Sequence, residues 1–189
     1  MANGGLHFGW KGNRARGAPF RRRFRCAALG LLLAAAPPAL ASDGLRVGIA
    51  AAAAHNYVRA AEIFLPLATA GDPRAQSYLG FMYANGQGVP QNYMVAAGWY
   101  RCAGDQGFAN AQYQLGLMYD RGQGVPQDYV MAYIWLNLAV AGAGPERDHW
   151  VPIRDAVRTK LTLLERQVAQ TLAFTAPPPH PCLPIQFGY

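Results

Sequence analysis

The sequence has no acidic residue before Asp43 and no surplus of charge after it. Its net charge of +7 comes from seven basic residues within residues 1–41, because residues 42–189 hold ten basic and ten acidic residues. A nucleic-acid-binding domain needs a basic surface to approach phosphates. The balanced remainder of the chain lacks that feature, and we expect no nucleic-acid partner.

No stretch of the chain is apolar over the roughly 20 residues that a membrane-spanning helix needs. The apolar segment Cys26–Ala36 follows the basic run Arg21–Arg25 and precedes two prolines and an Ala-Leu-Ala sequence ending at Ala41. This order predicts a signal peptide over residues 1–41, cleaved after Ala41, and a periplasmic or secreted protein without a membrane span after cleavage. Twin-arginine export and retention as an uncleaved anchor stay open as alternatives.

The usual residue patterns of a catalytic or metal site are also missing. His55, His149 and His180 lie far apart, and none has a Cys, Asp, Glu or second His at a metal-ligand spacing. No Gly-flanked serine nucleophile and no plausible Cys–His pair is present. The sequence therefore predicts no enzyme, no bound metal and no cofactor.

A repeat of 36 residues is the main positive feature of the chain. Residues 73–108 align with residues 109–144 without gaps and share 16 of 36 positions. The register continues backwards, since Asn56-Tyr57 matches Asn92-Tyr93, so that an earlier unit ends near Gly71. Self-similarity at this period is typical of a helical solenoid, which predicts an all-α fold of helix-turn-helix repeats.

The repeat divides the chain into segments, and each full unit reads as two helices. The first helix begins after the N-cap Asp72, whereas the second copy has Phe108 there and lacks a cap; the second helices begin after Asn92 and Asp128. After the signal peptide the predicted order is a partial repeat (42–72), repeat 1 (73–108), repeat 2 (109–144), a helical cap (145–174) and a Pro-rich tail (175–189).

The glycine loop GQGVPQ lies between the two helices of each unit. It lacks the third glycine and the following Lys and Ser/Thr of a phosphate-binding loop. We interpret it as structural, with a left-handed Gly86 ending the first helix. The positions expected to maintain the repeat are Leu79, Gly80, Tyr83, Gly86, Gly88 and Trp99, and in the second copy Leu115, Gly116, Tyr119, Gly122, Gly124 and Trp135.

The C-terminal segment also has helical periodicity. Thr162 and Glu165 form a capping box at the start of its last helix. We expect this helix to close the open end of the solenoid, as terminal repeats do. Its apolar side consists of Leu163, Leu164, Val168 and Leu172.

Residues 75–107 and 111–144 closely resemble the Sel-one-like repeat, a relative of the tetratricopeptide repeat, at nearly every position of the pattern A-x-x-x-L-G-x-x-Y-x-x-G-x-G-V-x-x-[DN]-x-x-x-A-x-x-W-x-x-x-A. The resemblance extends over roughly residues 44–174 and implies an α/α solenoid that scaffolds or recruits other proteins. If tetratricopeptide geometry holds, seven varying positions face a concave, partner-binding groove. They are Ser77, Phe81, Asn85, Tyr113, Leu117, Asp120 and Arg121.

Three further possibilities follow from the same residues. A disulfide between Cys102 and Cys182 would attach the tail to the solenoid, although a buried thiol at Cys102 is the simpler interpretation. Some cysteine-rich exported relatives are linked to penicillin binding or hydrolysis, but this chain lacks their regular cysteine pairs, so a cell-envelope hydrolase or β-lactam-binding protein is an alternative. Self-association into a homo-oligomer through exposed repeat ends is another, since three units are near the minimum for a stable solenoid.

Overall fold

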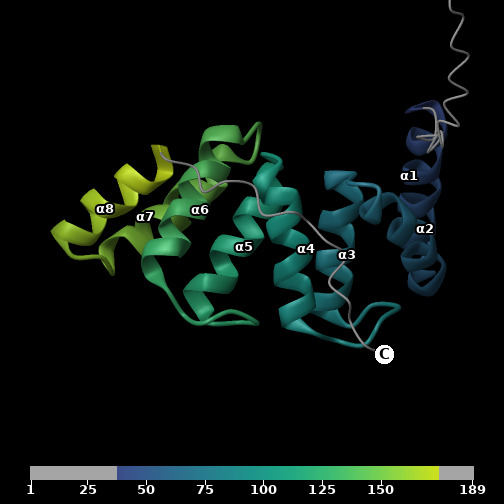
Figure 1. Cartoon of the computed structure of the whole chain (residues 1–189), viewed down its shortest axis with the longest axis horizontal. Coiled ribbons are helices and arrows are strands. Elements are labelled where there is room, and N and C mark those ends of the chain that lie inside the picture. Colours follow the sequence, from purple (N-terminus) through teal and green to yellow (C-terminus); the bar gives the residue numbers. More distant parts are fainter. Residues whose placement is uncertain (1–37, 175–189) are drawn as a thin grey trace, which may run out of the picture. The chain divides into compact units, whose positions relative to one another are not determined.

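The chain folds into a row of helices, as the sequence predicts. The computed structural model describes residues 38–174, and within them eight α-helices follow one another in chain order (Figure 1). Three helix pairs, α1–α2, α3–α4 and α5–α6, stack through α2–α3 and α4–α5. The helices are α1 (Pro38–Ala53), α2 (Tyr57–Thr69), α3 (Pro73–Asn85), α4 (Tyr93–Asp105), α5 (Ala109–Arg121), α6 (Tyr129–Gly142), α7 (Arg147–Thr159) and α8 (Leu163–Phe174).

The helix starts follow the local sequence. The Asp72 carboxylate accepts hydrogen bonds from the backbone N–H groups of Arg74 (2.8 Å) and Ala75 (3.2 Å), which caps α3. The side chains of Asn92 and Asp128 cap α4 and α6 in the same way. Phe108 gives α5 no side-chain cap. All four predictions are confirmed, and each cap contributes about 1 kcal/mol to helix stability.

The glycine loop ends one helix and contacts the preceding unit. Gly86 and Gly122 are left-handed at φ +66° and +68°, and each donates its N–H to a methionine carbonyl one turn back. Gly88 and Gly124 are also left-handed, at φ +71° and +72°. A Cβ atom on Gly124 would overlap the Tyr93 carbonyl and lie 2.6 Å from the Met94 nitrogen, at the start of α4. The loop is therefore a contact between units as well as a turn.

A glycine on the first helix of each pair makes room for a large side chain of the second helix. A Cβ atom on any of the three would meet that side chain too closely for a real contact. The pairs are Gly48 with Phe64 (2.5 Å), Gly80 with Tyr100 (2.8 Å) and Gly116 with Leu136 (2.7 Å). The α1–α2 pair thus follows the same plan, with a turn of residues 54–56 where the α3–α4 pair has residues 86–92.

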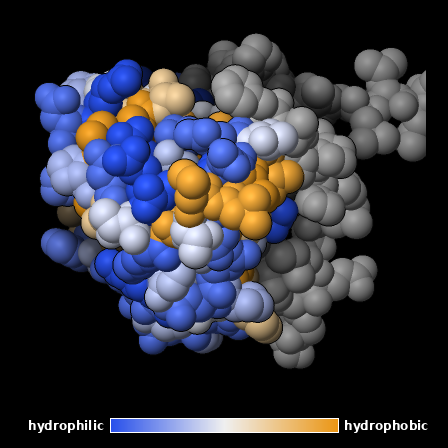
Figure 2. Space-filling model, turned by 90° about the vertical axis from the view of Figure 1, so that its left-hand side faces the viewer, coloured by the Kyte–Doolittle hydropathy of each residue, from blue (hydrophilic) through white to orange (hydrophobic). Residues whose placement is uncertain are grey.

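The C-terminal helices both pack on α6. The capping box is present, because Glu165 accepts from the Thr162 N–H (2.7 Å) and hydroxyl (2.8 Å). The apolar side of α8 faces solvent: Leu163 and Leu164 are 72% and 69% exposed, whereas Ala169 is buried. Figure 2 views the molecule from the α8 end and shows a hydrophobic patch within a mostly hydrophilic surface.

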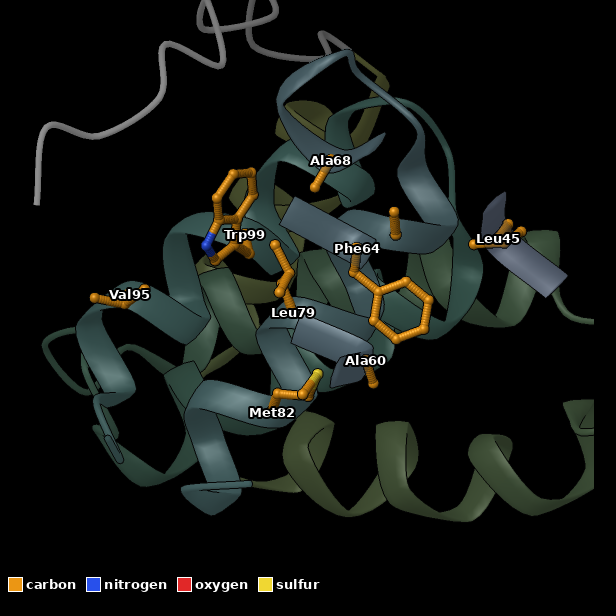
Figure 3. Close-up of a cluster of buried hydrophobic side chains, with 9 residues drawn as sticks. Leu45, Ala60, Phe64, Ala68, Leu79, Met82, Val95 and Trp99 are labelled. Carbon is orange, nitrogen blue, oxygen red and sulfur yellow. The ribbon is translucent and has the colours of Figure 1, made fainter. Parts of the chain in front are cut away.

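The core consists of small clusters that each join neighbouring helices. In the first cluster, Leu45 of α1 and Phe64 of α2 lie with Leu79 and Met82 of α3 and with Trp99 of α4 (Figure 3). The next cluster repeats this plan one unit later, around Leu115, Met118 and Trp135. Because every unit shares its core with the next, the units stabilise one another.

Two buried glutamines join one unit to the next by hydrogen bonds. The amide of Gln76 on α3 donates to the Ala68 carbonyl at the end of α2 (3.0 Å), and Gln112 on α5 donates to the Gly104 carbonyl in the last turn of α4 (2.9 Å). Both side chains are buried. The repeat identity at these positions therefore reflects a polar contact that fixes successive helix pairs.

Candidate partner-binding groove

A groove runs lengthwise between α3 and α5, the first helices of the two full repeats. It consists of a first hollow of about 520 Å³ beside their N-terminal halves and a second hollow of about 230 Å³ beside their C-terminal halves. Phe81, Tyr100 and Gln114 line both hollows, so the two hollows adjoin. The groove is formed mainly by side chains of the first helices, and Tyr93 and Tyr100 of α4 also belong to its lining.

The first hollow is mainly apolar. Helix α1 forms one wall with Leu45 and Ile49. Phe81 is 46% exposed and Ile49 is 36% exposed, so the hollow presents apolar surface to solvent. Its apolar lining residues are Leu45, Ile49, Tyr78, Phe81, Tyr100 and Phe108. Concave apolar surface with a few polar groups is typical of binding sites.

The second hollow is more polar. Leu117 extends the apolar surface of Phe81 into this hollow. Its polar lining residues include Asn85, Gln123 and Arg121. Among the residues that line the two hollows, the charged ones are Arg74 and Arg121. Arg74 forms an ion pair with Asp72 (3.2 Å), whereas Arg121 has no ion pair within residues 38–174. The groove therefore carries positive charge and no carboxylate in its lining.

Burial affects two phenols, that of Tyr100 in the groove lining and that of Tyr113 on the same helix as Leu117 and Arg121. Burial raises the pKa of Tyr100 above its usual range. Burial also raises the pKa of Tyr113, an effect that the nearby positive charge of Arg121 opposes. Both phenols stay neutral at physiological pH, so the Tyr100 hydroxyl can serve the groove as a hydrogen-bonding or packing group only.

The structure brings together five of the seven groove residues that the sequence suggested: Ser77, Phe81, Asn85, Leu117 and Arg121. It places the other two against the C-terminal helices. The ring of Tyr113 stacks on Trp150 of α7 at a centroid distance of 4.8 Å. Asp120 forms an ion pair with Lys160 (2.6 Å), just after α7. These two side chains thus contact the C-terminal helical cap. Because Asp120 pairs with Lys160, it does not neutralise the charge of Arg121.

The sequence did not predict three of the groove residues, Leu45, Ile49 and Tyr100. Leu45 and Ile49 occupy the positions of Ser77 and Phe81 in the partial unit, but the shorter turn shifts the register by four residues. Tyr100 belongs to a second helix, whose repeat position holds Leu136 in the next unit. The signal that identifies Leu45 and Ile49 is the spacing of Gly48 and Phe64, which matches Gly80 and Tyr100 only with that shift.

The remaining predicted groups lie apart from the groove lining. Cys102 on α4 is disulfide-bonded. Cys182 lies outside the described residues, as does His180, so the Cys102–Cys182 pairing stays a prediction. His55 contacts the Tyr57 hydroxyl (3.0 Å). Residues 38–174 contain no group of three or more His, Cys, Asp or Glu side chains placed to hold a metal ion. They also contain no helix whose length and apolar character would let it span a membrane.

Comparison with known proteins identifies the repeat. The family model described as Sel1 repeat matches residues 73–108 and 109–143. The chain contains two Sel1 repeats. Their fold generally mediates protein–protein interaction, and the family is typically a non-catalytic interaction scaffold. No curated protein matches the chain.

Solved structures with Sel1-like repeats agree in fold. One is c5321, a protective antigen present in uropathogenic Escherichia coli strains that displays an SLR fold, with 31% identity over 71% of this chain and a TM-score of 0.66. Another is a Sel1 repeat protein from Oxalobacter formigenes, with 35% identity over 52% of this chain and a TM-score of 0.50. This chain spans 29% and 39% of the lengths of those two proteins.

Proposed function

We propose that this Sel1-repeat protein is a non-catalytic scaffold of the cell envelope that binds a protein partner in the groove between α3 and α5. The observation that supports this most directly is the exposure of Phe81 and Ile49 beside a hollow of about 520 Å³. Exposed apolar surface that gathers in a concavity is typical of binding sites, whereas single exposed apolar residues are not.

The framework around the groove is well suited to binding. Gln112 and the left-handed glycine loops fix the spacing between units, and Tyr113 and Asp120 hold the cap on α5. The groove residues therefore lie on helices that are already in place before a partner arrives. A preorganised surface loses less conformational entropy on binding, so more of its contact energy appears as affinity.

The proposed location in the periplasm or outside the cell comes from the leader sequence. Helix α1 begins at Pro38, and its residues after the expected cleavage point include Leu45 and Ile49. Cleavage after Ala41 thus retains the α1 wall of the groove. N-terminal sequencing of the protein from a periplasmic fraction should begin at Ser42; an intact leader on a membrane-bound protein would contradict this location.

A matched pair of variants tests the groove. Phe81→Ser removes the apolar side chain that both hollows share, and Met94→Ala removes a side chain that is 69% exposed and absent from either lining. In chemical cross-linking and affinity capture from envelope extracts, the proteins bound by the wild type should also be bound by Met94→Ala and be lost with Phe81→Ser. If Phe81→Ser keeps the same bound proteins and a wild-type circular dichroism spectrum, the groove is not the binding surface.

Self-association through α8 is the second candidate, and a specific observation favours it. Leu164, Val168 and Leu172 are spaced at i, i+4 and i+8 and are all exposed. The two charged residues of α8, Glu165 and Arg166, are engaged by Thr162 and by the Leu161 carbonyl. A second copy could therefore pack the same face against it in a closed, two-fold dimer without charge repulsion. The outer side of the last helix is also where a further unit would stack.

Sedimentation velocity of the purified protein tests this dimer. We expect a dimer for the wild type and for Gln170→Glu, which adds charge to α8 outside the stripe, and a monomer for Val168→Glu. A monomeric wild type would contradict the dimer. If removal of residues 175–189 converts that monomer into a dimer, the tail covers the face instead.

A further inference from the structure

We propose that the groove selects an extended peptide in which a large apolar side chain and a carboxylate lie about two residues apart. This inference rests on the proposed function and specifies its ligand. It is carried by the order of chemical groups along α3 and α5, by the unengaged amides of the lining and by the one-sided charge of the groove.

The order of groups sets the spacing of the ligand. Phe81 and Leu117 occupy equivalent repeat positions, as do Asn85 and Arg121 one helical turn later. Four residues of α-helix rise about 6 Å. An extended peptide advances about 3.3 Å per residue. A side chain placed on Phe81 and Leu117 is therefore followed, about two residues on, by one that reaches Arg121.

The charge of the groove selects an acidic ligand. Asp120, the neighbour of Arg121, is engaged by Lys160, and Arg74 is paired with Asp72. Arg121 is thus the lining cation whose charge no ion pair in residues 38–174 compensates. A guanidinium group can bind a carboxylate through two parallel hydrogen bonds, which fixes the orientation of the ligand.

The amides of the lining suit a peptide backbone. The side chains of Asn110, Gln114 and Gln123 make no hydrogen bond within the described part of the chain. Each side-chain amide offers two donor hydrogens and one acceptor oxygen, the same complement that a peptide backbone requires. A simple fatty acid satisfies Arg121 and the apolar hollow but leaves these amides unused, which favours a peptide.

Selection and measured affinity test the proposal together. A random library of displayed eight-residue peptides is selected on the purified protein, with Phe81→Ser protein as the counter-selection. The retained peptides are then labelled and titrated by fluorescence anisotropy. We expect Phe, Leu, Ile, Met or Trp with Asp or Glu two residues away in the retained peptides. Arg121→Gln should weaken binding about tenfold and reduce its salt dependence.

Pairs of peptides that differ only in the selected acidic residue separate the contribution of the charge to affinity from that of the other contacts. Replacing the selected Glu by Gln should weaken binding to the wild type about tenfold and leave binding to Arg121→Gln unchanged, because the pair is then already broken. Met94→Ala should bind like the wild type. Retained peptides without an acidic residue, or an Arg121→Gln variant with wild-type affinity, would overturn this inference.

The outcomes also distinguish this inference from the proposed function. Neutral peptides that depend on Phe81 would overturn the acidic preference and leave the groove as a binding site. Laurate binding that depends on Phe81, with no peptide retained, would overturn the peptide ligand. A library from which no peptide is retained in a Phe81-dependent manner, together with no laurate binding, would count against both.

Discussion

Alanine at Gly124, the second glycine of the loop in repeat 2, should destabilise the protein more than alanine at Gly107, another left-handed glycine. Gly124 and Gly107 both have positive φ, at +72° and +82°. Alanine in this region costs about 1–2 kcal/mol at either position. Around Gly107 a Cβ atom would meet nothing within 4 Å, whereas on Gly124 it would overlap the backbone of Tyr93 and Met94.

The overlap sets the extra cost at Gly124. Backbone atoms cannot rotate away as a side chain does, so the loop must shift from the start of α4, at a further cost of about 1–3 kcal/mol. We therefore expect Gly107→Ala to lower the free energy of unfolding by about 1–2 kcal/mol. Gly124→Ala should lower it by about 2–5 kcal/mol.

Urea unfolding followed by circular dichroism at 222 nm measures both values. With a slope of about 2 kcal/mol per M, the midpoint should fall by about 0.5–1 M for Gly107→Ala and by about 1–2.5 M for Gly124→Ala. Gly88→Ala should behave like Gly124→Ala, because its Cβ atom would overlap Tyr57 in the same way. Equal midpoints for Gly107→Ala and Gly124→Ala would refute the contact between units as the reason for the glycine.

The other predictions concern a buried amide, a cysteine and a carboxylate. Gln112→Ala removes the side-chain hydrogen bond to the Gly104 carbonyl, which keeps its backbone donor Gly107. It should lower the free energy of unfolding by about 0.5–1.5 kcal/mol, while Gln114→Ala, in the groove, should be near neutral; equal urea midpoints would contradict this. The exported protein should gain about 2 Da on reduction if Cys102 and Cys182 pair; mass spectrometry that finds two free thiols would refute the pairing. The hydrogen bonds from Thr162 lower the pKa of Glu165, so the stabilisation of α8 is present above the ordinary glutamate pKa and is lost as pH falls through the lowered value. Helicity should therefore drop more steeply in acid for the wild type than for Glu165→Gln, and parallel acid titrations by circular dichroism would contradict it.

Local signals in the sequence were sufficient for the helix pairs. Asp72, Asn92 and Asp128 cap helices because a short side-chain oxygen at that point reaches the free N–H groups of the first turn. Gly86 is left-handed because a residue without a Cβ atom adopts that conformation without strain. Such effects involve neighbours in sequence, so they can be read without knowing the rest of the fold.

Contacts between the repeats and the C-terminal helical cap could not be predicted in this way. Helix α7 has no match in the repeat, so its place on α5 and α6 depends on side chains that no period reveals. For this reason Tyr113 and Asp120 looked free in the sequence, although Trp150 and Lys160 engage them. The exposure of the apolar side of α8 could not be predicted for the same reason, because periodicity identifies an apolar side but not what packs against it.

Site-specific photo-cross-linking in living cells would reveal whether a partner occupies the groove between α3 and α5. A photoreactive phenylalanine analogue is placed at position 81, at position 117 or, as a control outside the groove, at position 94. We expect the same cross-linked partner from positions 81 and 117 and none from position 94. Cross-links from position 94 alone, or the same product from all three positions, would contradict it.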